Sequence, residues 1–200
     1  MHDIKNHTVK SFSKCHWQTV VFAVIFLLFA FLLVRYQIKL LHFYQWEDES
    51  ETIVTAKMMA AGYKLYTEVF NPHGPLTFLP GALIEKFGSF GIPGHRVVII
   101  FLQLLTLTSI YKSPLITSSD RFAKLSYTVV AATLMAVFFP FHFFSHMYTY
   151  QVMAGLLATI ILSQFTLPLI SDPDHINSNK SIVFWNLLIV SLPFFSIAYA

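Results

Sequence analysis

The sequence predicts an all-α integral membrane protein with about five transmembrane helices and a large first extracytoplasmic loop that carries short surface helices. Of its 200 residues, 56% are hydrophobic and only 12% are charged. Soluble globular chains carry about twice that share of charge. Several apolar runs approach the roughly 20 residues that a transmembrane helix needs. By this interpretation residues 1–200 form a single membrane domain.

The apolar run Val20–Val34 predicts the first transmembrane helix. A signal peptide has a similar basic start and apolar middle, but no small-residue cleavage site follows this run. The further apolar runs predict helices at Val97–Tyr111, Leu125–Phe141, Tyr148–Ile170 and Ser181–Ala200. The chain stops inside the last run, which favours a truncated or partial product.

Positive charges predict which side of the membrane each connection faces. The connection after the second predicted helix contains Lys112, Arg121 and Lys124, opposed only by Asp120. The positive-inside rule places this connection in the cytoplasm. The N-terminus, which is also rich in lysine, then lies in the cytoplasm as well, and residues 46–94 form an extracytoplasmic loop. A bacterial inner membrane is the expected location, and the endoplasmic reticulum is the alternative.

Two other features of the composition limit the partners. The net charge of +3 is small and scattered, which argues against nucleic acid. Cys15 is the single cysteine, so an internal disulfide and a cysteine-based zinc site are excluded. The lipid bilayer is the partner that the composition indicates.

The loop begins with an acidic cluster that is unsuited to hydrocarbon. Residues 46–76 contain five of the ten acidic residues of the chain. A charge is costly inside a bilayer, so this stretch should emerge at a membrane face. Asp48, with Glu51 three residues later, predicts a capping box at the start of a helix. Apolar residues at helical spacing continue this helix, and Gly62 should end it.

The second half of the loop predicts a turn and another short helix. Asn71–Pro75 contains two prolines and a glycine, a composition that predicts a rigid turn. Leu76–Phe87 then predicts a helix on the membrane surface, which Gly88 should stop.

Four features of this loop occur together in a recognisable order. They are the pair Asp48-Glu49 after Trp46, the small and apolar run Ile53–Gly62, the tyrosine-rich segment Tyr63–Phe70, and the turn His73-Gly74-Pro75-Leu76. In this order and position, over about residues 35–111, the sequence resembles the GT-C superfamily of polyprenyl-phosphate-sugar-dependent glycosyltransferases. The nearest resemblance is to the branch that contains protein O-mannosyltransferases and the aminoarabinose transferase of lipid A.

The resemblance implies an inverting hexosyl- or pentosyltransferase. It would move a sugar from a polyprenyl-phosphate donor to an unknown extracytoplasmic acceptor, which is a lipid, a polysaccharide or a protein. Asp48 would act as the catalytic base that accepts or positions the proton of the acceptor hydroxyl. Glu49 would assist Asp48 or bind a divalent metal ion. The alternative is that Asp48 only caps the helix, and one aspartate can do both.

Cationic and polar residues elsewhere are candidates for substrate binding, because positive charge stabilises a leaving phosphate. They are Lys57, Tyr63, Lys64, His73 and Arg96, and an arginine fork suits phosphate oxygens best. The alternative is a solvated face for the two lysines and an interfacial anchor for Arg96.

His142 and His146 have the spacing of two metal ligands on one helix face. No third ligand is near in the sequence, which favours two interfacial histidines and no predicted metal site.

Two functions compete with the transferase. One is a non-catalytic multi-pass membrane protein, such as a transporter subunit or an assembly factor, whose carboxylates bind a partner or an ion. Transporters place polar groups near the membrane midplane, whereas the predicted spans of this chain contain almost no ionisable residues. The other is an inactive, truncated glycosyltransferase.

Overall fold

The computed structural model describes residues 17, 20–21, 24, 27–28, 31–32, 34–44, 47–116, 121–135, 146–171 and 179–195. Within these residues every regular element is a helix, and the one pairing of extended residues is an isolated bridge between Leu65 and Val69. The predicted all-α class is therefore confirmed for the described part of the chain.

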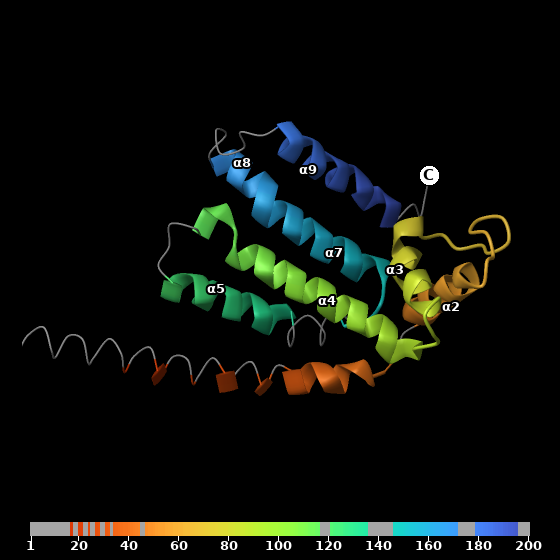
Figure 1. Ribbon diagram of the computed structural model, residues 1–200, viewed down its shortest axis with the longest axis horizontal. Coiled ribbons are helices and arrows are strands. Elements are labelled where there is room, and N and C mark those ends of the chain that lie inside the picture. The colour runs from red at the N-terminus through yellow and green to blue at the C-terminus, as the bar shows by residue number, and fades with distance from the viewer. Residues whose placement is uncertain are drawn as a thin grey trace, which may run out of the picture.

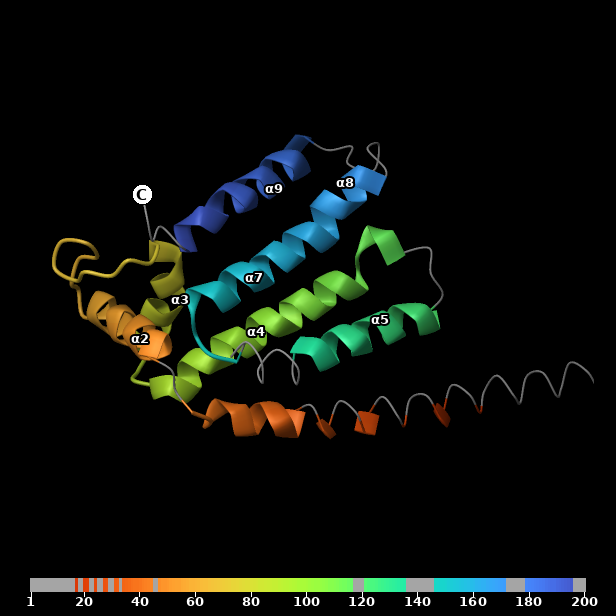
Figure 2. The same cartoon turned by 180° about the vertical axis from the view of Figure 1, so that it is seen from behind.

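One group of helices lies side by side, and a second group crosses it at one end (Figure 1). The first group contains α4 (Gly91–Tyr111), α5 (Arg121–Thr133), α7 (Tyr150–Ile161) with its continuations η3 (Leu162–Thr166) and α8 (Leu167–Ser171), and α9 (Asn179–Ser191). The crossing helices are α2 (Glu47–Ala60) and α3 (Pro75–Glu85). Short 3-10 turns follow α4 at η1 (Pro114–Ile116) and α9 at η5 (Leu192–Phe195). The same arrangement is seen from behind in Figure 2.

Two of the described helical stretches, Gly91–Tyr111 and Tyr150–Ser171, are long and apolar enough to cross a membrane. Their exposed faces carry large apolar side chains, such as Phe101, Leu104 and Leu162, which suit contact with lipid. Length and composition thus support a membrane protein. The first predicted span, Val20–Val34, is described only in part, and Ser181–Phe195 is a shorter apolar helix.

Glycine and proline residues correctly predicted where the helices of the loop end and begin. Gly62 has a φ of +101° directly after α2, so the predicted end of this helix is confirmed. The helix α3 begins at Pro75, where a missing N–H costs nothing, close to the predicted start at Leu76.

The second predicted span begins earlier than expected. The helix α4 starts at Gly91, which has a φ of +61°, and not at Val97. Proline fits the first turn of a helix, so Pro93 is no obstacle to this early start. The loop therefore ends before Gly91, and His95 and Arg96 lie inside α4, where both side chains are buried.

The core between the two groups of helices is centred on Tyr148, just before α7. Tyr148 belongs to one buried cluster with Ile53, Ile99 and Met153. Its hydroxyl donates to the Thr77 carbonyl at 2.9 Å and accepts from the Gly81 N–H at 2.7 Å. The Thr77 carbonyl and the Gly81 N–H are four residues apart in α3, and in a regular α-helix they would bond to each other directly. The tyrosine hydroxyl thus completes the hydrogen bonding of α3 from outside.

We expect Tyr148→Phe to lower stability by about 1–3 kcal/mol, because the change leaves two buried backbone groups without a partner. Thermal unfolding of the purified protein in detergent would measure this loss. Tyr127→Phe is the matched control, because Tyr127 is exposed on α5. Equal melting temperatures for the two variants would show that the bridge contributes nothing.

Candidate functional site

A buried ion pair lies where α2, α4 and the segment before α7 meet. The Arg96 guanidinium donates from Nε to Glu49 Oε1 at 2.8 Å and from Nη2 to Oε2 at 2.5 Å. The arginine is 1% exposed and the glutamate is fully buried. The Tyr148 N–H also donates to Glu49 Oε1, at 2.9 Å. A bidentate pair with an additional donor offsets much of the desolvation cost of both charges.

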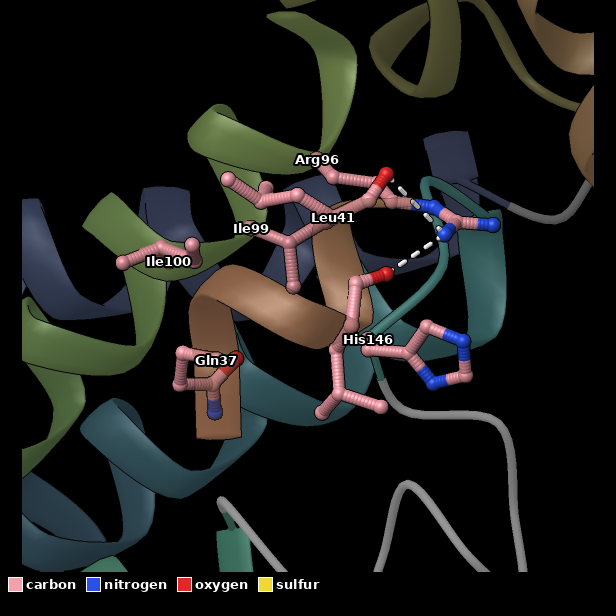
Figure 3. Close-up of a pocket in the computed structure, with 7 residues that line it drawn as sticks. Gln37, Leu41, Arg96, Ile99, Ile100 and His146 are labelled. Carbon is pink, nitrogen blue, oxygen red and sulfur yellow. Dashed lines mark hydrogen bonds between the residues drawn. The ribbon is translucent and has the colours of Figure 1, made fainter. Parts of the chain in front are cut away.

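Arg96 also binds the end of the first helix (Figure 3). Residues 34–41 are helical, and the carbonyl oxygens at the end of a helix lack intrahelical partners and carry partial negative charge. The guanidinium donates to the carbonyls of Leu40, Leu41, Phe43 and Tyr44, at 2.6, 3.3, 2.9 and 3.0 Å. One arginine therefore holds the first helix, α2 and α4 together.

The prediction that Arg96 faces a donor phosphate does not agree with this geometry. Its N–H groups are already used by Glu49 and by backbone carbonyls, and the side chain is buried. The proposal that Glu49 binds a divalent ion meets the same difficulty, because a cation would have to displace the guanidinium. Among the described residues, no group of three or more His, Cys, Asp or Glu side chains is placed to hold a metal ion.

His146 lies beside the ion pair. Its side chain is buried, and neither ring nitrogen has a hydrogen-bond partner within the described part of the chain. Burial, reinforced by the charge of Arg96 and opposed by Glu49, lowers the pKa of His146 to about 4. The imidazole is therefore neutral at pH 7. His142, its predicted partner, lies outside the described residues.

A small hollow next to Arg96 is too narrow to admit a water molecule. Figure 3 shows its lining, which is largely apolar and consists of Gln37, Leu40, Leu41, Arg96, Ile99, Ile100 and His146. This hollow does not have the size of a substrate pocket.

Asp48 does not share the burial or the contacts of its neighbour Glu49. The helix α2 begins at Glu47, so Asp48 lies in its first turn and the predicted capping box is wrong. The Asp48 carboxylate is half-buried and makes no hydrogen bond or ion pair among the residues that the structure describes. Successive helix residues point about 100° apart, so burial of Glu49 directs Asp48 away from the core.

The other member of the predicted capping box, Glu51, holds the turn Asn71–Pro75. The Asn71 amide donates to Glu51 Oε1 at 3.0 Å and to Thr55 Oγ1 at 2.9 Å, and its Oδ1 accepts from the His73 N–H at 3.0 Å. Asn71 itself is buried. The turn is thereby fixed against α2, as its composition predicted.

His73 is buried in this turn. Its ring stacks on Tyr150 with centroids 4.1 Å apart, and its carbonyl accepts from the Tyr66 hydroxyl at 2.7 Å. His73 Nδ1 has no partner within the described part of the chain. The residue is therefore packed against Tyr150 and does not face open solvent.

The remaining predicted binding residues do not gather around Asp48. Lys57 lies in the last turn of α2, about 14 Å along the helix axis from Asp48 at 1.5 Å per residue. Tyr63 and Lys64 are exposed in the segment that follows. The Lys64 N–H donates to Glu68 Oε2 at 2.7 Å. The structure thus brings together Glu49, Arg96 and His146, and it leaves both lysines at the other end of α2.

Sequence reasoning missed Tyr148 and His146 as members of this site. Both lie in the connection before α7, about 100 residues from Glu49 along the chain. No local pattern indicates such a contact.

No protein-family model, curated protein or solved structure matches this chain. The fold and the site therefore define only a class: a helical protein with two helices able to cross a membrane, and a buried ion pair at one end of them.

Proposed function

We propose that the chain is a membrane glycosyltransferase that moves a sugar from a polyprenyl-phosphate donor to an acceptor hydroxyl. In this proposal the fold has about five membrane spans, and residues 46–90 face the extracytoplasmic side of a bacterial inner membrane. The sequence resemblance at Asp48-Glu49 and at the turn before α3 supports it, and so does the apolar character of α4 and α7.

The observation that carries the proposal is the contrast between the two neighbouring acids. Glu49 is committed to Arg96 and Tyr148, whereas Asp48 has no partner within the described residues. A carboxylate without a structural partner, on a helix that is held in place by its neighbour, is suited to act as a base.

The proposed step is a single displacement. The acceptor oxygen attacks the anomeric carbon while the bond from this carbon to the phosphate oxygen breaks. Asp48 takes the hydroxyl proton, and the polyprenyl phosphate leaves with the bonding electron pair. The anomeric configuration is inverted because no covalent sugar–enzyme intermediate forms.

The experiment compares cells that carry the wild-type gene with cells that carry Asp48→Asn at equal protein level. Mass spectrometry of envelope glycans, glycolipids and polyprenyl-phosphate sugars would show one acceptor without its sugar, and its lipid donor accumulating. Glu68→Gln is the matched control, because it removes one exposed acidic charge from the same loop. Unchanged profiles in the Asp48→Asn cells would favour a non-catalytic membrane protein.

The topology has its own test. We expect a cysteine at Ser89, in a Cys15→Ser background, to react with a membrane-impermeant maleimide added from outside the inner membrane. Ser89 is exposed between α3 and α4, so access to the thiol depends on the side of the membrane alone. Labelling only after the membrane is opened would reverse the topology and remove the basis of the proposed function.

A further inference from the structure

Glu85 and His95 form a second buried pair, apart from the ion pair of Arg96. Glu85 ends α3 and His95 lies in the second turn of α4. Glu85 Oε1 and His95 Nε2 are 3.6 Å apart, and neither atom has another polar partner in the described part of the chain. The His95 side chain is fully buried and that of Glu85 is 5% exposed.

The other nitrogen of His95 determines what Nε2 can do. Nδ1 lies 2.8 Å from the Gly91 carbonyl oxygen. A carbonyl oxygen only accepts hydrogen bonds, so Nδ1 must carry a hydrogen. In a neutral imidazole Nε2 is then an acceptor. An ionised Glu85 would place a second acceptor opposite it, and both would remain buried without a donor.

We propose that Glu85 and His95 together form a buried proton-binding site. One proton on this pair converts two opposed acceptors into a donor that faces an acceptor, with no net charge on the pair. Without this proton the pair carries one buried negative charge, which is costly in a low-dielectric environment.

The neighbouring groups do not supply a different donor. The ring of Tyr148 meets His95 edge-on at 5.1 Å, and its hydroxyl is occupied by Thr77 and Gly81. On the same turn of α4, Arg96 is occupied by Glu49 and by backbone carbonyls. The proton itself therefore links α3 to α4, independently of whether the chain transfers sugar.

The sign of the pH dependence follows from proton counting. At pH 8 a free glutamate is ionised and a free histidine is neutral, so the unfolded pair lacks the shared proton. The proposed site holds one proton more, so we expect stability to fall as the pH rises above the range in which free histidine is charged. Between about pH 5 and pH 6 the unfolded histidine is mostly charged and the unfolded glutamate is still mostly ionised, so both states hold about one proton and this dependence disappears.

Glu85→Gln separates this proposal from ordinary packing. The glutamine amide is isosteric with the carboxyl group and supplies its own N–H to His95 Nε2. It therefore makes the same link with no shared proton. The variant should fold, and its stability should no longer depend on this site as the pH changes.

The experiment measures melting temperature in detergent from pH 6 to pH 9 for wild type, Glu85→Gln and the exposed control Glu68→Gln. We expect wild type and the control to lose about 3 °C more than Glu85→Gln over this range. His95→Gln, whose amide can donate to an ionised Glu85, should be as insensitive as Glu85→Gln. If Glu85→Gln falls in parallel with wild type, the proton-binding site does not exist.

Discussion

Arg96→Met should abolish the recovery of folded protein. The change leaves the Glu49 carboxylate buried without a counter-charge, and breaking a buried pair in this way costs about 3–5 kcal/mol. It also removes the donor to four carbonyls at the end of the first helix. These losses together are a large part of the roughly 5–15 kcal/mol that stabilises an ordinary domain. Size-exclusion chromatography of the detergent extract would show whether a monodisperse species remains.

Two controls identify the cause of this loss. Arg35→Met removes the same charge at an exposed position and should leave the chromatogram unchanged. Arg96→Lys keeps the charge but cannot make the bidentate contact to Glu49, so we expect it to fall between wild type and Arg96→Met. A monodisperse Arg96→Met variant with the wild-type melting temperature would refute the structural role of the pair.

Asp48→Asn should reduce sugar transfer by about 100-fold or more without loss of stability. A positioned base contributes roughly 10²–10⁴-fold to rate. The Asp48 carboxylate has no partner among the described residues, so its replacement leaves no buried group unsatisfied. The initial rate in membranes, with the donor and acceptor identified by the cell profiles, measures the first effect. The melting temperature measures the second.

Substitutions of the two acids should affect different properties: stability for Glu49 and the rate of sugar transfer for Asp48. Glu49→Gln should lower the melting temperature, because the amide cannot balance the charge of Arg96. Asp48→Glu moves the carboxylate outward by one methylene and should retain only part of the rate. If Asp48→Ala transferred sugar at the wild-type rate, the assignment of the base would be wrong.

The fold class and the local elements were predictable from the sequence. Apolar runs predicted helices because a membrane span must satisfy its own backbone hydrogen bonds. Gly62, Asn71–Pro75 and the start of α3 were predictable because proline and glycine act through the dihedral angles of their own residues. The acidic cluster after the first predicted span suggested the loop in which we propose a catalytic residue.

Only the tertiary structure distinguished the roles of these residues. In the sequence Asp48 and Glu49 are equivalent neighbours. The start of α2 at Glu47 and its packing against α4 turn Glu49 toward Arg96 and leave Asp48 without a partner among the described residues. From the sequence, Arg96 could be a phosphate ligand or an interfacial anchor. The early start of α4 places it in the core. The physical reason is that a charge acquires its role from the groups that desolvate and pair it, and here most of those groups lie more than 40 residues away.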